Sequence, residues 1–244
     1  MKFILTSYLD TYDKDESGNR IAKNFGNENY ILDTLKKYIL NYNNFLFVAS
    51  DEYNFDATDV YANVTFESFD LTLPFKNYQI LDSRTEKYAN KMIEEADLIF
   101  LCGGHLPTQN KFFNRINLKD KLKRSQAFVI GGSAGAMNMA ENVYSIPELE
   151  GESIDPNFKR NLVGLGLTDI NILPHYDVFT NVILDGKRFI EEIVLPDTDK
   201  RIVYALNNGS YILVDEKAYL YGEAYLLKDG IINKINNNNE IKEL

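Results

Sequence analysis

Apolar residues in this chain gather in short uninterrupted runs, and the segments between the runs carry apolar positions at helical spacing. Runs that are apolar throughout are typical of strands in a parallel sheet covered on both faces. Apolar positions three or four residues apart are typical of amphipathic helices. The expected strands are residues 2–7, 44–49, 79–81, 98–102, 127–130 and 170–173, and the expected helices are residues 30–39, 56–69, 85–95, 134–140 and 187–195. This alternation predicts an α/β protein with a doubly wound, mostly parallel sheet flanked by helices.

The pattern changes after residue 200, where short apolar segments follow one another with only turn signals between them. These segments are residues 202–205, 211–214, 218–221, 224–227 and 231–235. They predict a C-terminal antiparallel meander on the edge of the main sheet. The asparagine run that follows is of low complexity, so residues 236–244 are expected to be a flexible, solvated tail. The length suits one large α/β domain, and we expect residues 1–244 to form it.

The run that ends in glycines and a serine carries the strongest chemical signal. Gly131-x-Ser133-x-Gly135 follows an expected strand and precedes an expected helix. This spacing is that of a nucleophile elbow, a sharp turn that holds a serine hydroxyl above the sheet. A tight glycine turn with a solvated serine is the alternative, because the bare motif also occurs by chance. The strand before it and the helix after it favour Ser133 as a nucleophile.

A serine hydroxyl needs a positioned base to attack at neutral pH, and histidine has the best matched pKa. The chain has two histidines, His105 and His175. His175 follows an expected strand, at the edge where open α/β sheets place their sites, and we assign it as the base. His105 follows the Gly103-Gly104 pair and is expected to line the substrate site. The backbone N–H groups of the Gly103-Gly104 pair are expected to supply one half of an oxyanion hole, and the N–H of Ala134 the other half.

Composition and charge exclude several other classes of protein. The net charge is −10 and no lysine or arginine run could track a phosphate backbone, so nucleic acid is not an expected partner. No apolar stretch reaches the length of a membrane span or a signal peptide, so we expect no membrane partner and a cytoplasmic location. The single cysteine, Cys102, excludes an internal disulfide and a cysteine-based zinc cluster. Nothing calls for a metal or an organic cofactor, and either a monomer or a homodimer is compatible with the sequence.

Three segments in order resemble the dipeptidase E and cyanophycinase family of serine peptidases. They are the strand ending in Gly103-Gly104, the elbow Gly132-Ser133-Ala134-Gly135, and the strand end Pro174-His175. The resemblance spans about residues 1 to 215 and implies the class I glutamine amidotransferase-like fold, which is flavodoxin-like. It implies that Ser133 is the nucleophile, His175 the base, and Gly104 with Ala134 the oxyanion donors. It also implies small peptides as substrates, including N-terminal aspartyl dipeptides, with His105 and Gly132 at the substrate site.

The resemblance fails at the third catalytic position. The family carries an acidic residue in a turn before a late strand, and here that turn reads Leu206-Asn207-Asn208-Gly209-Ser210, which places Asn208 there. An amide can fix the wrong histidine tautomer, although cysteine peptidases use asparagine as the orienter. Asp177 is a possible substitute.

The residues leave three functions to weigh against one another. The first is a serine peptidase that cleaves small peptides through an acyl-enzyme on Ser133. The second is a binding or regulatory protein on the same fold, with activity impaired by Asn208. The third, an esterase of the α/β-hydrolase fold, is disfavoured because that fold places its histidine last, after the acid, and no histidine follows His175.

Overall fold

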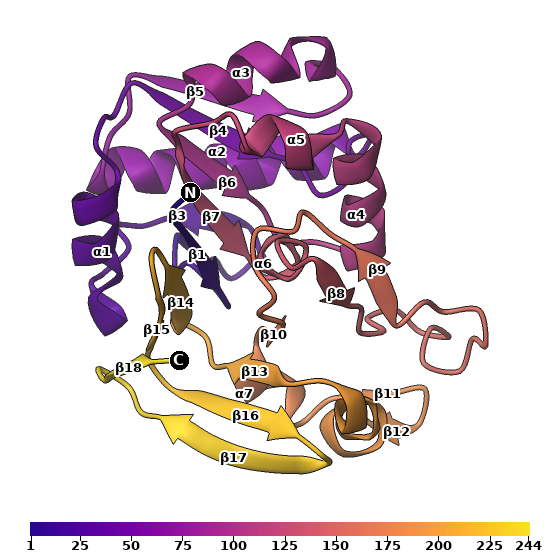
Figure 1. Ribbon diagram of the computed structural model, residues 1–244. Helices are drawn as coiled ribbons and strands as arrows, with labels where there is room; N and C mark the ends of the chain where they lie inside the picture. The colour runs from indigo at the N-terminus through magenta and orange to yellow at the C-terminus, as the bar shows by residue number, and fades with distance from the viewer.

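The computed structural model describes residues 1–244, and an eight-stranded sheet forms its centre (Figure 1). The strand order is β18-β15-β14-β1-β7-β6-β4-β5. Five strands are parallel: β1 (Phe3–Thr6), β4 (Asn44–Val48), β5 (Asn77–Leu81), β6 (Leu98–Leu101) and β7 (Phe128–Gly132). Three antiparallel strands extend the β1 side: β14 (Tyr211–Val214), β15 (Ala218–Tyr221) and β18 (Ile241–Glu243). The predicted mostly parallel α/β sheet is confirmed.

Helices cover both faces of this sheet, which explains why its central strands β1, β6 and β7 are buried along their whole length. On β4, Phe45 and Phe47 belong to one buried cluster, whereas Leu46 and Val48 belong to the other, as the two-residue period of a strand requires. The first cluster includes α1 (Ile31–Tyr38) and α2 (Phe55–Thr72). The second includes α3 (Ala89–Glu95), α4 (Leu106–Arg115), α5 (Leu118–Leu122) and α6 (Ala134–Met137). The 3-10 turns η1 (Glu28–Tyr30) and η2 (Glu86–Tyr88) lead into α1 and α3.

A second sheet of four strands lies below the main sheet in Figure 1, in the order β10-β13-β16-β17. Its strands are β10 (Ile172–Leu173), β13 (Val203–Leu206), β16 (Ala224–Lys228) and β17 (Ile231–Asn236). The predicted C-terminal antiparallel strands are present, and β14, β15 and β18 extend the edge of the main sheet, but β13, β16 and β17 lie in the second sheet rather than in one meander. The strands after residue 200 alternate between the two sheets, because β13 pairs with β10 and β16, whereas β14 pairs with β1 and β15. Turn signals mark where strands end but do not select their partners.

The expected flexible tail also needs correction, because residues 241–243 form β18 and pair with β15. The side-chain amide of Asn236 donates to the carbonyl oxygens of Gly222 (3.0 Å) and Glu240 (2.9 Å). Lys217 Nζ lies 2.6 Å from Glu243 Oε1. The asparagine run is thus the turn between β17 and β18.

Short elements surround the edge where the parallel strands end. They are β2 (Tyr12–Lys14) with β3 (Arg20–Ala22), β8 (Asn142–Tyr144) with β9 (Asn161–Val163), β11 (Ile183–Leu184) with β12 (Lys187–Arg188), α7 (Tyr176–Phe179), the π-helix η3 (Phe189–Val194) and the 3-10 helix η4 (Leu195–Lys200). The helix predicted over residues 187–195 therefore begins as a strand. No helix has both the length and the apolar character that crossing a lipid bilayer requires.

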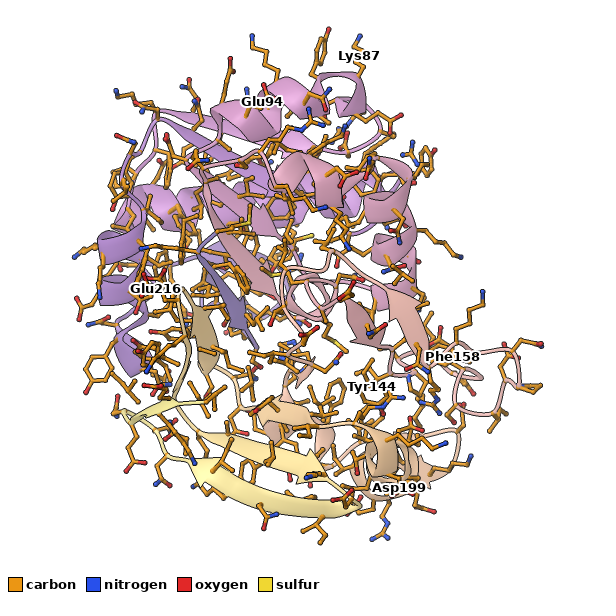
Figure 2. The ribbon with its side chains drawn as sticks, in the orientation of Figure 1. Lys87, Glu94, Tyr144, Phe158, Asp199 and Glu216 are labelled. Carbon is orange, nitrogen blue, oxygen red and sulfur yellow. The ribbon has the colours of Figure 1, made fainter.

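Tyr144 connects the main body to the segment that precedes the second sheet (Figure 2). Its ring is 1% exposed, and its hydroxyl donates to Asp197 Oδ2 at 2.9 Å. The Arg201 guanidinium lies 4.3 Å from the ring centroid. Lys87 and Glu94, in contrast, lie on the outer surface over η2 and α3. The contacts of Tyr144 show that apolar and polar packing together hold the two sheets in place.

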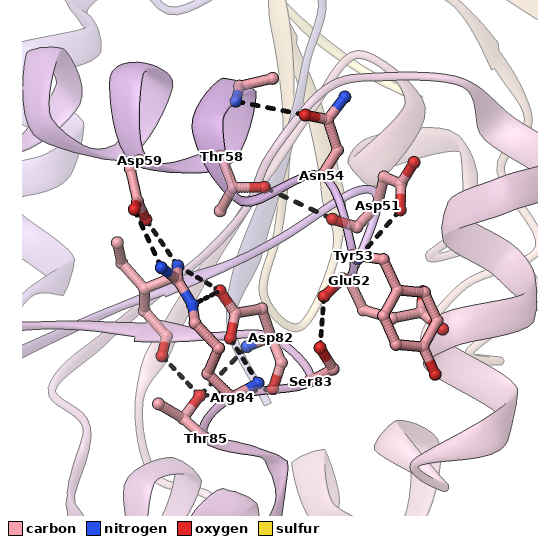
Figure 3. Close-up of polar contacts among 12 residues, drawn as sticks. Asp51, Glu52, Tyr53, Asn54, Thr58, Asp59, Asp82, Ser83, Arg84 and Thr85 are labelled. Atoms are coloured by element: carbon pink, nitrogen blue, oxygen red, sulfur yellow. Dashed lines mark hydrogen bonds and ion pairs between the residues drawn. The ribbon is translucent and has the colours of Figure 1, made fainter.

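Arg84 joins the loop after β5 to helix α2, as Figure 3 shows. Its guanidinium contacts both Asp59, on α2, and Asp82, directly after β5. Arg84 Nε lies 2.9 Å from Asp82 Oδ2, and the Asp82 side chain is only 1% exposed. The two carboxylates hold the pKa of Arg84 above its ordinary value, and the guanidinium lowers the pKa of Asp59.

Replacing Arg84 with methionine should lower the free energy of unfolding by about 2 kcal/mol, because a buried carboxylate loses its cation. The half-exposed guanidinium makes this loss smaller than for a fully buried pair. Arg188→Met is the control, since Arg188 pairs with glutamates at the surface (side chain 65% exposed) and its replacement should leave the free energy of unfolding nearly unchanged. Urea unfolding measures both. If Asp82→Asn added to Arg84→Met recovered no stability, the unpaired carboxylate would not be the cause.

Candidate active site

The elbow between β7 and α6 holds Ser133 in a strained backbone conformation, with φ 51° and ψ −118°. Such conformations persist where surrounding contacts enforce them, often at functional sites. The Ser133 N–H donates to the Thr6 carbonyl oxygen at 2.9 Å, which ties the elbow to β1. A Cβ atom at position 135 would overlap the Leu101 carbonyl oxygen, so only glycine lets α6 begin this close to β6. The strand, sharp turn and helix predicted from the sequence are present.

His175 lies directly after β10 and faces Ser133 from the second sheet. Its Nε2 atom is 3.0 Å from Ser133 Oγ. Its backbone is left-handed (φ 55°), and its carbonyl oxygen accepts the N–H groups of Val178 and Phe179 at the start of α7. The Tyr8 and Phe179 rings both lie near the imidazole, with centroid distances of 6.4 Å and 6.3 Å. These contacts fix the ring in reach of the serine hydroxyl.

Asn208 completes a row of three side chains, because its Oδ1 atom lies 2.7 Å from His175 Nδ1. It sits in the turn between β13 and β14, which Ser210 N closes on Asn207 O at 3.0 Å. Since β13 belongs to the second sheet and β14 to the main sheet, this turn crosses from one to the other. The structure therefore brings together Ser133, His175 and Asn208, the three residues that sequence reasoning singled out.

Ser7, which sequence reasoning missed, supports the orientation of the Asn208 amide. Its buried Oγ atom accepts the His175 N–H at 2.7 Å and lies 3.4 Å from Asn208 Oδ1. With the amide oxygen on this side, the Ser7 hydroxyl proton has an acceptor, and a buried donor without one is costly. The same oxygen then accepts the proton of His175 Nδ1, which leaves Nε2 free to accept the Ser133 proton. This is the tautomer that a general base needs.

Asp177 does not take the place of the missing acid. Its Oδ1 atom accepts the backbone N–H of Asn208 at 3.0 Å, so it positions the turn and forms no hydrogen bond with the imidazole. Burial lowers the pKa of His175 below its ordinary value, whereas the Asn208 hydrogen bond and the Asp177 charge act in the opposite direction. The imidazole is therefore neutral at neutral pH.

The Gly103-Gly104 pair lies against the elbow. A Cβ atom on Gly103 would be 3.2 Å from Ser133 Cβ, and one on Gly104 (φ 156°) would overlap the Ser50 hydroxyl. Neither glycine N–H donates a hydrogen bond within the protein. Ala134 is the first residue of α6, where an N–H has no partner inside the helix. The groups expected to hold an oxyanion are thus beside Ser133 and free of other acceptors.

His105 and Gly132 have structural partners of their own. His105 Nδ1 lies 2.8 Å from Thr108 Oγ1 and its Nε2 lies 2.9 Å from Glu152 Oε1, so both ring nitrogens are engaged. Gly132 ends β7, and a Cβ there would lie 3.2 Å from the Phe100 ring. A substrate contact by either residue stays a prediction. Cys102 is buried, and burial raises the pKa of its thiol to about 12, which makes it unreactive.

Arg20 is a further residue near this edge that the sequence did not reveal. Its guanidinium carbon lies 5.0 Å from the Tyr12 ring centroid and 4.9 Å from that of Tyr61, and it forms no ion pair. The Tyr12 ring contacts Tyr8, whose ring faces His175. An exposed cation without a carboxylate partner therefore lies two aromatic rings from the imidazole. The sequence gives no signal for Arg20, because its contact with Tyr61 joins segments that lie far apart in the chain.

No cluster of three or more histidine, cysteine, aspartate or glutamate side chains could hold a metal ion. A pocket of about 870 Å³ opens at the opposite edge of the main sheet, beside Lys2, Asp97 and Phe128, and none of the three residues of the row lines it. The chemistry therefore centres on the carboxyl edge of the parallel strands, where open α/β sheets bind their ligands.

A serine elbow at the carboxyl edge of an α/β sheet, with an imidazole facing the serine hydroxyl, is an arrangement typical of hydrolases. Residues 18–221 match Peptidase family S51, and the chain belongs to that family. Among solved structures it is similar to a protein from Listeria monocytogenes EGD-e that is provisionally named as a peptidase E. That similarity has a TM-score of 0.58 at 15% identity and covers 96% of this chain and 98% of the other, which shows a shared fold. No curated protein matches the chain. The resemblance stated from the sequence motifs is thus confirmed.

Proposed function

We propose that this protein is a serine-type peptidase that hydrolyses small peptides through an acyl-enzyme on Ser133. The observation that carries the proposal is the row in which His175 Nε2 lies 3.0 Å from Ser133 Oγ while Nδ1 lies 2.7 Å from Asn208 Oδ1. A nucleophile, a base and a group that orients the base are the elements of this chemistry. Membership of a peptidase family supports the same reaction class.

In the proposed reaction, Ser133 Oγ attacks the peptide carbonyl carbon while its proton passes to His175 Nε2. The N–H groups of Gly104 and Ala134 stabilise the oxyanion of the tetrahedral intermediate. The protonated imidazole then gives its proton to the leaving amine, and water repeats the sequence on the acyl-enzyme. The amide of Asn208 holds the imidazole but carries no charge to stabilise its protonated form.

Short peptides with an extra carboxylate are the proposed substrates, and N-terminal aspartyl dipeptides are the first to test. The unpaired guanidinium of Arg20 supports this, since arginine binds carboxylates through two parallel hydrogen bonds. Two further basic residues, Lys187 and Arg188, lie in a surface hairpin, and Arg188 contacts Glu191 and Glu192.

Hydrolysis of a dipeptide panel by freshly purified protein tests the proposal. The panel contains N-terminal aspartyl, glutamyl and neutral dipeptides, and free amino acids are the readout. Turnover that depends on Ser133 supports a peptidase. Stoichiometric peptide binding without turnover, in both wild type and Asn208→Asp, would instead support a binding protein on this fold.

Arg20→Gln should raise KM for aspartyl dipeptides about tenfold and leave kcat unchanged, because a charge-assisted hydrogen bond contributes roughly 1.5 kcal/mol to binding. Neutral dipeptides should be unaffected. Arg188→Gln removes an arginine that already has glutamate partners, and its kinetics should match wild type. Equal loss on acidic and neutral peptides would assign Arg20 a structural role.

A further inference from the structure

The turn that carries Asn208 contains an Asn-Gly pair, and it is the only one in the chain. In such a pair the backbone nitrogen of the glycine can attack the side-chain carbonyl carbon of the asparagine, because glycine has no Cβ to obstruct the approach. We propose that Asn208 is a modification site, and that its spontaneous deamidation supplies the acidic third residue of the active site. This inference rests on the proposed function for its consequence but not for its chemistry.

Each atom that takes part in the step is free or activated in the structure. The Gly209 N–H donates no hydrogen bond within the protein, so the attacking nitrogen is not held elsewhere. Asn208, Gly209 and their neighbour Asn207 are half-buried, so water reaches the turn. The Asn208 amide nitrogen donates no hydrogen bond within the protein, whereas Oδ1 accepts the His175 Nδ1 proton at 2.7 Å. A donor on this oxygen stabilises the negative charge that develops as the carbonyl carbon is attacked.

The covalent change requires only water. Gly209 N forms a bond to Asn208 Cγ and loses its proton, which water carries to the departing side-chain nitrogen; that nitrogen leaves as ammonia, and a cyclic imide remains. Water then adds to one of the two imide carbonyls. Addition at Cγ breaks the new Cγ–N bond and leaves an aspartate in the normal chain, whereas addition at the backbone carbonyl yields isoaspartate. The His175 donor polarises the Cγ carbonyl and therefore favours aspartate.

The product places a carboxylate within hydrogen-bond distance of His175 Nδ1, where the amide oxygen stood. A carboxylate stabilises the imidazolium that forms when Ser133 gives up its proton, which an amide cannot do. Newly made protein would thus carry a weak site that strengthens with time, without a second enzyme or a cofactor.

Peptide mapping by mass spectrometry tests this on the full-length protein. Freshly purified wild type is incubated at neutral pH in heavy-oxygen water, and the peptide containing residues 207–209 is followed with time. We expect exchange of amide for acid at Asn208 to be at least about tenfold faster than at Asn207 in the same turn, because only Asn208 precedes a residue without a Cβ. Aspartate should exceed isoaspartate, and His175→Ala should reverse that preference.

The same samples are assayed on the dipeptide panel beside Asn208→Asp, which has the product side chain from the start. Activity of wild type should rise with the aspartate fraction toward the Asn208→Asp value. If Asn208 remains an amide while the asparagines at 236–239 convert, or if isoaspartate dominates, the modification proposal is overturned. If aspartate forms but neither sample hydrolyses any peptide, the proposed function has failed and the modification stands on the mass change alone.

Discussion

Ser133→Ala should lower kcat by on the order of 10⁵-fold on every dipeptide that the wild type cleaves, because Ser133 carries the hydroxyl that forms the hydrogen bond with His175 Nε2. The methyl group cannot donate the proton that His175 Nε2 is placed to receive at 3.0 Å. Substrate binding should persist, since the oxyanion donors and Arg20 are unchanged. KM should therefore change much less than kcat.

The measurement combines kinetics with covalent labelling by a serine-directed phosphonate probe. Wild type should be labelled at Ser133, and Ser133→Ala should not be labelled at all. Ser17→Ala is the matched control, because Ser17 is exposed in the turn between β2 and β3 and should leave both readouts unchanged. If Ser133→Ala retained more than about a tenth of the activity, the acyl-enzyme mechanism would be excluded.

Asn208→Asp should raise kcat by on the order of 10²-fold relative to fresh wild type. Exchanging a triad aspartate for asparagine in a serine protease costs about 10⁴-fold, largely through the wrong tautomer. Here the amide oxygen already selects the right tautomer, so only the missing charge remains to be restored. The gain in kcat from Asn208→Asp should therefore be smaller than the roughly 10⁴-fold loss that the reverse exchange causes in a serine protease.

The pH dependence gives an independent check on this variant. In wild type, burial lowers the pKa of His175 below the ordinary imidazole value of about 6.5. The base therefore becomes protonated, and activity falls, only at a pH below that value. A carboxylate at position 208 stabilises the imidazolium and raises that pKa. The imidazole then remains protonated to higher pH, so the acidic limb of the kcat profile should move to higher pH. Asn181→Asp adds the same charge on the exposed surface and should not move it. An unchanged limb in Asn208→Asp would contradict the contact between residue 208 and His175.

Much of the main sheet is predictable because its strands are buried on both faces and are therefore apolar at every position. The elbow is predictable for a related reason, since Gly135 is required by the close approach of the Leu101 carbonyl. The placement of β13 and β14 in different sheets was not predictable. Both strands are short and mostly apolar, and the turn between them does not indicate which partner strand each one takes.

The residues of the site likewise fall into those that local sequence indicates and those that it does not. Ser133 and His175 each follow a strand and a recognisable turn, so local sequence indicated them. Ser7 and Arg20 act through contacts with segments far away in the chain. Ser7 meets His175 across 168 positions, and no local pattern distinguishes its hydroxyl from that of other buried serines. Such residues become visible only when the tertiary arrangement is known.

Because the catalytic side chains come from two sheets, hydrolysis requires the two sheets to be correctly assembled. Ser133 follows a strand of the eight-stranded sheet, and His175 follows a strand of the four-stranded sheet. Asn208 lies in the turn between β13 and β14, which connects the two sheets. Neither sheet alone contains a nucleophile and its base. A chain that has formed its parallel sheet but has not docked residues 172–206 therefore has no base beside Ser133, and peptide hydrolysis requires both sheets to be in place.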